Sequence, residues 1–311
     1  MEEALASIVR VKRSQTVQSL MLTTRLRFIE PQLASPVDQP PEGKHWIHEI
    51  KHHGYRAQVV IERGQVRVFS RNGHDWSDRY PGIVRAAASL RCQTAIIDGE
   101  AIVQNGDGAS DFEALSSAMR QRPHSIILYA FDLLHLNGKD LRQQTLSERR
   151  ALMKHLVGAD GESRIQFSEE FDGDGAALFD ACAERALEGI VSKHSLAPYR
   201  SGRSRTWLKT KCFTESTFVV VGTDRDHKTG ALMALLAHSA GLKYAGAAFI
   251  TLSGDERKEF LAEVERLTTS WGAFKSTRAT DVKWCQPMLV VRVKHLAGTK
   301  MLRHATVRGF E

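Results

Sequence analysis

The chain has 311 residues, of which 42% are hydrophobic and 25% charged, and its formal net charge is +7. This length allows two domains that each have a core, and the composition is that of an ordinary globular protein. The sequence has no apolar run long enough to span a bilayer, no signal-peptide pattern, and four scattered cysteines without a CxxC pair. We therefore expect a cytoplasmic protein without a membrane segment, a disulfide framework or a cysteine zinc site.

The first part of the chain contains a strand that ends in a lysine. Residues 4–20 predict a helix or a flexible arm, and the prolines between 31 and 41 predict an extended connector with little regular structure. A short strand, Trp46 to Lys51, then places Glu49 and Lys51 on one face, and Gly54 allows a tight turn. Such a lysine is either a nucleophilic amine or an ordinary solvated strand end. Lys51 becomes a candidate only through the residues that follow it.

The middle of the chain predicts strands and short helices whose ends carry polar side chains. Gly99-Glu100 reads as a turn that projects a carboxylate between two apolar strands. Thr206 to Lys211 alternates, so that Lys209 and Lys211 share a face. The predicted strands are Arg56 to Ile61, Gln65 to Ser70, Ala95 to Asp98, Ala101 to Val103, Ser125 to Leu134 and Leu187 to Lys193, and the predicted helices are Ile83 to Leu90, Asp111 to Arg120, Ser147 to Leu156 and Asp174 to Ala186. A loop is predicted from Ser195 to Arg205.

Beyond Cys212 the composition changes and short strands predominate. We expect strands at Thr217 to Thr223, Leu232 to His238, Leu242 to Phe249 and Met288 to Leu296. One helix interrupts them, with a capping box formed by Ser253 and Glu256. Its apolar face consists of Phe260, Leu261, Val264 and Leu267. Strands with a single intervening helix predict a small barrel of the oligonucleotide-binding (OB) type.

Positive charge is segregated in two regions. The segment from Lys283 to Phe310 has six basic residues and no acidic one. A second cluster lies within twelve residues and comprises Arg200, Arg203, Arg205, Lys209 and Lys211. The alternative is an ordinary solvated face, but same-sign charge without acidic neighbours favours a polyanionic partner.

Together the polar residues form an inventory suited to chemistry at a nucleotide phosphate. The amine of Lys51 would attack phosphorus, arginines and lysines would neutralise phosphate oxygens, and carboxylates would hold a divalent metal. An aromatic ring such as that of Phe131 can stack on a purine, although a lone phenylalanine is more often a core residue. The set comprises Lys51, Arg56, Arg71, Glu100, Phe131, Glu188, Lys209 and Lys211.

Six short motifs carry a resemblance to a known family. They are Lys51-His52-His53-Gly54-Tyr55-Arg56, Ser70-Arg71-Asn72-Gly73, Asp98-Gly99-Glu100, Tyr129-Ala130-Phe131-Asp132, Glu188-Gly189-Ile190-Val191-Ser192-Lys193 and Trp207-Leu208-Lys209-Thr210-Lys211. In this order they resemble the nucleotidyltransferase motifs of ATP-dependent DNA ligases. Phe28 to Leu33 and Tyr199 to Ser204 are similar to the ligase domain of bacterial end-joining ligases.

The resemblance implies an α+β fold and a reaction. It divides the chain into an N-terminal arm or helix (residues 1–27), a nucleotidyltransferase (adenylation) domain of antiparallel sheets with helices (28–212) and an OB-fold domain (213–311). It implies ATP and Mg²⁺ or Mn²⁺ as cofactors, and nicked or broken duplex DNA as the partner of a monomer that works in DNA repair, with end-joining proteins as further partners. ATP would adenylate Lys51, AMP would pass to a 5′-phosphate, and a 3′-hydroxyl would displace it.

The resemblance also implies roles for single residues. Glu49 would contact the adenine, Phe131 would stack on it, and Lys209 with Lys211 would hold the α-phosphate. The remaining nucleotide contacts would be Arg56, Arg71 and Glu100, the metal ligands Glu100 and Glu188, and the DNA contacts Arg200, Arg203, Arg205, Lys294, Lys300 and Arg303.

Three departures from the family pattern stand out. The family has an aspartate two residues after the nucleophile, and this chain has His53. The family's last motif has a basic cluster of which Arg303 is present, but no counterpart of its terminal Arg and Lys precedes Glu311, which bears on self-adenylation. Arg292 lies where related ligases carry an acid. A transition-metal cluster of His48, His52 and His53 is a minor alternative.

Two alternatives to an active DNA ligase stay open. One is a degenerate ligase that binds nicked DNA through its basic surface and transfers little AMP, for which His53 speaks. The other is an RNA ligase or a capping guanylyltransferase, against which the predicted OB-type barrel and the Tyr199 to Ser204 segment argue. Histidine at position 53 predicts that His53→Asp keeps or raises the sealing activity.

Overall fold

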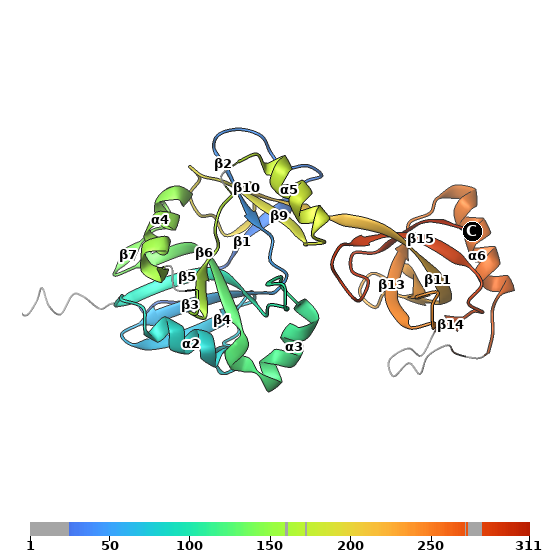
Figure 1. The fold of residues 1–311 in the computed structure, drawn as a ribbon, viewed down its shortest axis with the longest axis horizontal. Helices are drawn as coiled ribbons and strands as arrows, with labels where there is room; N and C mark the ends of the chain where they lie inside the picture. Colours follow the sequence, from blue (N-terminus) through green and yellow to red (C-terminus); the bar gives the residue numbers. More distant parts are fainter. Residues whose placement is uncertain (1–24, 159–160, 172, 271, 273–281) are drawn as a thin grey trace, which may run out of the picture.

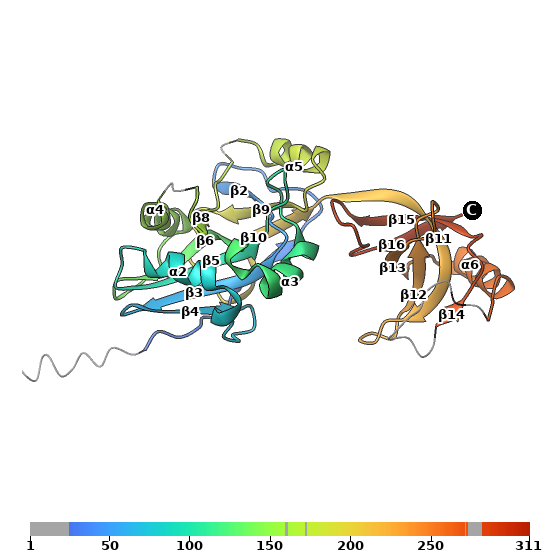
Figure 2. The same ribbon diagram turned by 60° about the horizontal axis from the view of Figure 1, so that its bottom comes forward.

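The computed structural model describes residues 25–158, 161–171, 173–270, 272 and 282–311. They form a larger lobe, built from the chain up to β10, and a smaller barrel, built from β11 to β16 (Figure 1). The long strand β11 (Phe213–Arg225) leads from the lobe into the barrel, as Figure 2 shows. The predicted segment 4–20 lies outside the described residues. In the part of the chain that is described, no helix has the length and apolar character needed to cross a membrane.

One sheet of the lobe carries most of the apolar core. Its strand order is β4-β3-β5-β6-β7, and β8 pairs with β6. The strands are β3 (Tyr55–Glu62), β4 (Gln65–Ser70), β5 (Thr94–Ile102), β6 (Ile127–Leu136), β7 (Lys139–Asp140) and β8 (Ile165–Phe167). The helices α2 (Pro81–Ala88), α3 (Phe112–Gln121) and α4 (Leu146–Val157) place apolar residues such as Ile83, Leu115 and Met153 in the same core. Two short 3₁₀ turns lie beside these helices: Ser77–Arg79 precedes α2, and Pro123–Ser125 follows α3.

The second sheet of the lobe brings together distant parts of the chain. Its order is β1-β10-β9-β2, with β1 (Gln32–Pro36), β2 (Trp46–Ile50), β9 (Gly189–His194) and β10 (Gly202–Lys211). Helix α5 (Gly175–Glu184) packs on it through Leu178 and Cys182. Trp207 and Tyr199 pack with Val60, Ile96 and Leu134 of the first sheet, so the two sheets share one apolar layer. The layer explains why the inner strands are apolar on both faces.

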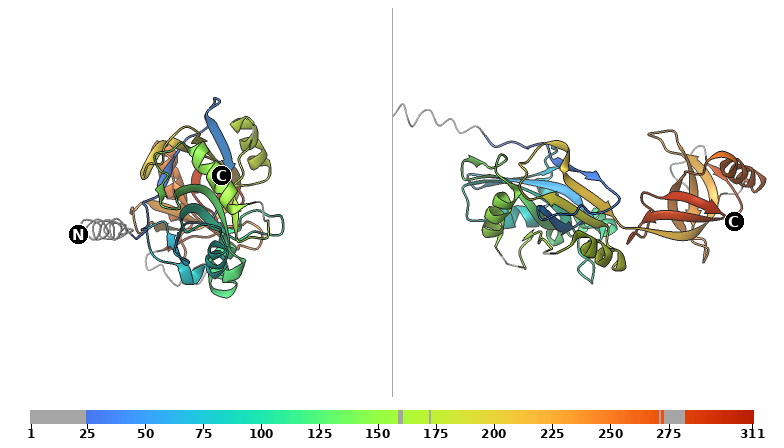
Figure 3. Two further views of the ribbon diagram at one scale, coloured as in Figure 1. Left: turned by 90° about the vertical axis from the view of Figure 1, so that its left-hand side faces the viewer. Right: turned by 90° about the horizontal axis from the view of Figure 1, so that it is seen from above.

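The barrel closes on itself. Strand β11 pairs with both β12 (Leu232–Ala237) and β15 (Val290–Leu296), and β13 (Tyr244–Ile250) and β16 (Thr306–Phe310) complete the ring. The short β14 (Lys283–Trp284) adds to β11. Helix α6 (Gly254–Arg266) buries Phe260 and Val264 against the barrel, as the 3.6-residue spacing of its apolar face predicts. Figure 3 shows the barrel standing beside the two sheets of the lobe.

The structure corrects four sequence-based expectations. The sheets are mixed rather than antiparallel, because β1–β10, β6–β8 and β13–β16 are parallel pairs. The proline-rich connector contains β1, whose edge position tolerates proline. β5 is one continuous strand rather than two strands around a Gly99-Glu100 turn. The glycine is needed for close strand packing instead of a turn, because a Cβ on Gly99 would lie 2.7 Å from the Tyr129 carbonyl oxygen. Ser253 makes no side-chain cap, whereas Thr145 and Glu148 form a capping box on α4.

Most other strands and helices lie close to their predicted positions, whereas the short strands β7, β8 and β14 were not predicted. The predicted loop from Ser195 to Arg205 is shorter than expected, because β10 already begins at Gly202. Strand β16 was not predicted, although its residues alternate between buried and partly exposed. A five-residue strand with one arginine and one glycine gives too weak a periodic signal for assignment from sequence.

A buried ion pair joins α4 to the first sheet. Arg149 donates from Nε and Nη2 to the two carboxylate oxygens of Asp132 at 2.7 and 2.8 Å, and both side chains are fully buried. The remaining Arg149 nitrogen donates to the carbonyls of Gln144 and Ala197. Each of the three Arg149 nitrogens therefore has an acceptor, as a buried charge requires.

We expect Asp132→Ala to lower the free energy of unfolding by about 3–5 kcal/mol, because it leaves the Arg149 guanidinium buried without its carboxylate. Urea denaturation followed by tryptophan fluorescence measures the change. Asp255→Ala is the matched control, because its ion pair with Lys258 is exposed and should contribute less than about 1 kcal/mol. Equal losses in the two variants would contradict this assignment.

Candidate active site

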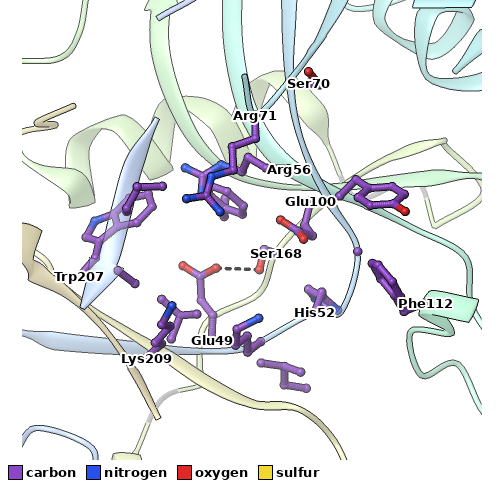
Figure 4. A pocket seen from close by; sticks show the side chains of 18 of the residues that line it. Glu49, His52, Arg56, Ser70, Arg71, Glu100, Phe112, Ser168, Trp207 and Lys209 are labelled. Atoms are coloured by element: carbon purple, nitrogen blue, oxygen red, sulfur yellow. Dashed lines mark hydrogen bonds between the residues drawn. The ribbon is translucent and has the colours of Figure 1, made fainter. Parts of the chain in front are cut away.

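A cleft of about 610 Å³ opens between the two sheets of the lobe. Its volume lies within the range of small-molecule sites in proteins. Seven of the nine nucleotide- and metal-binding residues expected from the sequence line it: Glu49, Lys51, Arg56, Arg71, Glu100, Phe131 and Lys209. In Figure 4 Arg56 and Arg71 both reach into the cleft, with Trp207 on one side of it and Glu100 on the other.

Lys51 follows directly after β2 and reaches a carboxylate in the cleft. Its Nζ donates to Oε2 of Glu188 at 2.7 Å, and its backbone N–H donates to the Gly189 carbonyl at 2.9 Å. Two glycines near Lys51 allow main-chain segments to pass close to each other. A Cβ on Gly54 would lie 2.2 Å from the Ala101 carbonyl oxygen, and Gly189 adopts a φ of +135°.

Glu188 binds a second cation besides Lys51. Its Oε1 lies 3.7 Å from Nζ of Lys211, and its side chain is almost fully buried. Lys211 itself does not line the main cleft, but it donates to Nε2 of His304 at 2.8 Å. The strand alternation predicted for Lys209 and Lys211 therefore brings both lysines to the same side, with Lys209 in the cleft and Lys211 at its edge toward the barrel.

Glu49 lies at the bottom of the cleft in a cluster that the sequence reasoning missed. Its Oε1 accepts from Lys193 at 2.6 Å and from Arg150 at 2.8 Å, and its Oε2 accepts from Ser168 at 2.8 Å. Burial alone would raise the pKa of Glu49, but Arg150 and Lys193 hold it below its ordinary value. The Glu49 carboxylate is therefore charged and already paired.

Of the two cationic partners of Glu49, only one could have been predicted from the sequence. Lys193 ends one of the resemblance motifs and could have been selected on that ground. Burial lowers its pKa to about 8, against the opposing charge of Glu49. Arg150 gave no such signal, because an arginine pair on a helix is usually an exposed polar face.

Arg56 is held beside the aromatic residues of the cleft. It donates from Nε and Nη2 to Asp98 at 2.6 and 2.7 Å, and Asp98 also accepts from the Tyr199 hydroxyl at 2.8 Å. The Arg56 Cζ lies 4.4 Å from the centre of the Phe131 ring, and Nζ of Lys193 lies 4.2 Å from it. The Phe131 ring is thus lined by cations, and it is nearly buried.

Glu100 faces the cleft from the middle of β5. Burial raises the pKa of its carboxyl group to about 7, with Lys51 and Arg56 opposing this change. In the described part of the chain, its carboxylate has no hydrogen bond or ion pair. Glu100 is therefore a carboxyl group near the Lys51–Glu188 pair that is available to bind a cation.

The basic residues expected to contact DNA lie in different places. Arg203 lines the cleft and Arg205 is exposed two positions further along β10, while Arg200 is exposed before this strand. Lys294 lies on the barrel with its Nζ 5.0 Å from the Phe213 ring, and Lys300 lines a smaller cavity between barrel and lobe. Arg303 comes from the barrel but lines the main cleft.

The three histidines of the opening motif do not converge on one point. His48 contacts the Ser192 hydroxyl at 2.9 Å, His52 stacks on Tyr129, and His53 stacks on Phe112. Within the described ranges, no three His, Cys, Asp or Glu side chains come together as a metal-binding group. The alternative of a transition-metal cluster at these histidines therefore loses its basis.

The chain was compared with protein families, with known proteins and with solved structures. The family described as "ATP dependent DNA ligase domain" matches residues 31–211. The multifunctional non-homologous end joining protein LigD of Pseudomonas aeruginosa is 34% identical over a 296-residue alignment that covers 91% of this chain and 35% of that protein. The SPbeta prophage-derived DNA ligase-like protein LigB of Bacillus subtilis is 26% identical over a 279-residue alignment that covers 88% of this chain and 94% of that protein.

A solved structure, a mycobacterial DNA ligase D complexed with ATP, has a TM-score of 0.56 at 27% identity and covers 90% of this chain and 94% of that chain. Fold and cleft thus define an enzyme of the nucleotidyltransferase class. The chain belongs to the ATP-dependent DNA ligase family. It spans about a third of the length of the LigD relatives, since the matches cover 35% and 36% of them.

We expect Glu100→Gln to remove a pH dependence of stability. The folded carboxyl has a pKa of about 7 against an ordinary 4.5, so between these values the folded chain binds more protons than the unfolded chain. The free energy of unfolding contributed by this group is therefore full below the lower value and is lost as pH rises through the upper one. The amide does not titrate, so from about pH 5 to pH 8 the variant should gain on the wild type by on the order of 1–3 kcal/mol.

Urea unfolding without ATP or metal at several pH values measures this difference. Glu184→Gln is the control, since Glu184 is an exposed carboxylate at the end of α5. Parallel curves for Glu100→Gln and the wild type would show that Glu100 is ionised throughout and would overturn the assignment.

Proposed function

We propose that the chain is an active DNA ligase that seals 5′-phosphate/3′-hydroxyl breaks in duplex DNA through a lysyl-AMP intermediate at Lys51. The contact between Lys51 Nζ and Glu188 at 2.7 Å, inside a cleft lined by cations, carries this proposal. An amine nucleophile needs a group that takes its proton, and Glu188 is within hydrogen-bond distance. The arginines and lysines around it neutralise phosphate charge.

The proposed reaction has three steps. The Lys51 amine attacks the α-phosphorus of ATP, a nitrogen–phosphorus bond forms, pyrophosphate leaves, and the proton of the amine passes to Glu188. An oxygen of a DNA 5′-phosphate then attacks the same phosphorus, the nitrogen–phosphorus bond breaks, and Lys51 leaves as an amine that takes its proton back from Glu188. The 3′-hydroxyl finally attacks the 5′-phosphorus and closes the strand, AMP leaves, and the hydroxyl proton passes to solvent. Arg56, Arg71 and Lys209 bind phosphate oxygens in these steps, and Lys211 supports the α-phosphate from the edge of the cleft.

The base of ATP would lie deeper in the cleft. Phe131 offers a ring for stacking and lines the same cleft as Glu49. Figure 4 shows the hydrogen bond from Ser168 to Glu49. Arg56 and Lys193 now lie against the Phe131 ring, so the purine must move at least one of these side chains to stack. Glu49 is engaged by three donors, which keeps the floor of the base site rigid.

Glu100 and Glu188 would hold the divalent metal, Mg²⁺ or Mn²⁺. Both are carboxylates, the oxygen ligands that these hard cations prefer, and Glu100 faces the cleft without a protein partner among the described residues. A bound metal would supply positive charge to phosphate oxygens. Its charge would also favour the ionised form of Glu100 over the protonated one.

The arrangement of the chain supports the domain boundaries expected from the sequence. We propose residues 28–212 as the adenylation domain and 213–311 as an OB-fold domain, since a closed barrel with one packed helix is the arrangement expected of an OB fold. The exposed arginines at the start of β10 and the basic residues of the barrel would contact duplex DNA.

The role in DNA repair by end joining is part of the proposal, because it rests on LigD relatives that are much longer than this chain. We infer a cytoplasmic monomer that acts on nicked or broken DNA with end-joining partners. A degenerate ligase that binds nicks without AMP transfer is the competing function, and the replacement of an acidic motif residue by His53 is the observation that favours it.

We expect Lys51→Ala to abolish covalent labelling of the protein by α-labelled ATP with Mg²⁺ or Mn²⁺, because among the described residues Lys51 is the lysine that both lines the cleft and donates to Glu188. Labelling is measured on denaturing gels, and the site is confirmed by mass spectrometry. Lys258→Ala on α6 is the control and should label like the wild type. Retained labelling of Lys51→Ala would refute the nucleophile, and preferential labelling by GTP would indicate a capping-type enzyme.

We expect Arg203→Ala with Arg205→Ala to weaken binding to nicked duplex DNA by about tenfold or more at low salt and to flatten its salt dependence, because two phosphate contacts are lost. Fluorescence anisotropy with a labelled nick measures both effects. Arg266→Ala is the control, since Arg266 is exposed on α6 and paired with Glu263. An unchanged salt slope would place the DNA elsewhere.

A further inference from the structure

The segment 297–305 between β15 and β16 lies against the lobe. In Figure 1 it extends from the barrel toward α3 and α5. The backbone N–H of Met301 donates to Oε1 of Glu113 on α3 at 2.9 Å, and a Cβ on Gly298 would lie 1.9 Å from the Ala186 carbonyl oxygen. His304 accepts from Lys211 at 2.8 Å. The barrel therefore contacts the lobe beside the cleft.

His53 lies at the centre of this contact. Its ring stacks on Phe112 with a centroid distance of 4.5 Å and an angle of 13°, and its backbone N–H donates to the Ser110 hydroxyl at 3.0 Å. The Arg303 guanidinium comes from the barrel, lies 4.3 Å from the same Phe112 ring, and is within hydrogen-bond distance of Nε2 of His53. Phe112 thus supports both members of an interdomain pair.

The His53 ring is suited to accept from a cation. Burial lowers its pKa to about 4; the charge of Glu188 opposes this change, and the charges of Arg303, Lys51 and Lys211 add to it. At neutral pH the ring is therefore uncharged, and because Arg303 has no acceptor, Nε2 must accept while Nδ1 carries the hydrogen. The imidazole is a neutral acceptor in a site where a protonated ring would repel Arg303.

From this geometry we propose that His53 is a positioning residue that docks the barrel onto the nucleotide cleft by accepting a hydrogen bond from Arg303. Docking keeps Arg303 on the wall of the cleft, where it can meet the phosphates of ATP. The inference rests on the proposed ligase function for its kinetic consequence, but the docking itself is independent of catalysis. It assigns to His53 a role of its own at the position where the family has an aspartate.

The chemistry of the pair predicts how replacements behave. A neutral acceptor binds a guanidinium less strongly than a carboxylate does, so an aspartate at position 53 should dock Arg303 at least as well. An alanine should leave Arg303 without its acceptor and free the barrel. Because His53 acts through Arg303, the two alanine substitutions should also fail to add in a double variant.

The test uses the full chain and four variants: His53→Ala, His53→Asp, Arg303→Ala and the double alanine variant. Small-angle X-ray scattering without ATP measures docking as the radius of gyration, and single-turnover labelling with ATP and Mg²⁺ measures adenylation of Lys51. We expect both single alanine variants to expand the molecule and to slow adenylation by about tenfold, the effect of one charge-assisted hydrogen bond. The double variant should be no slower than the slower single, and His53→Asp should restore the compact form and the rate.

Additive losses of about a hundredfold in the double variant, or an unchanged radius in His53→Ala, would overturn the proposal. So would failure of His53→Asp to restore compactness. If His53→Ala does not fold, Arg303→Ala and His53→Asp still decide, since Arg303 is a half-buried residue on the barrel side. A wild type that never becomes adenylated would refute the proposed function, while the scattering comparison would still decide the docking.

Discussion

The buried carboxylate of Glu49 is the constraint on which the cleft depends. It receives Arg150 from α4, Lys193 from β9 and Ser168 from the chain after β8, so one charge connects both sheets of the lobe and a helix. A buried charge keeps its partners in place because losing any of them leaves it uncompensated. Lys51 follows two residues later on the same segment, and its position at Glu188 therefore depends on this connection.

Around this floor the cleft combines paired and unpaired charges. Arg56 is held by Asp98, and Lys51 by Glu188, so these side chains are preorganised. Arg71 is exposed at the rim, and Glu100 has a raised pKa, which is the state of a carboxyl group that lacks a partner. Preorganised groups position a phosphate, whereas unsatisfied ones gain most from a bound cation or ligand. The barrel adds Arg303 to the same cleft and thereby makes the site dependent on both parts of the chain.

Much of the lobe could be predicted from local patterns. The hairpin of β3 and β4 and the caps of α3 and α5 follow from alternation and from Asp111 and Asp174, because these signals act within a few residues. The prediction of a turn at Gly99-Glu100 was wrong because the reason for this glycine is not local. Glycine there serves the close approach of β6, a contact that lies outside any local window.

The sequence by itself determined the inventory of the site: a lysine after a strand, arginines and carboxylates at strand ends, and paired lysines on β10, because period and motif order are local properties. Only the tertiary structure decided which charges meet. Glu49 and Arg150 are 101 residues apart, and His53 and Arg303 are 250 residues apart. Such pairs form when packed sheets and a docked barrel bring distant segments together, and no spacing along the chain encodes that geometry.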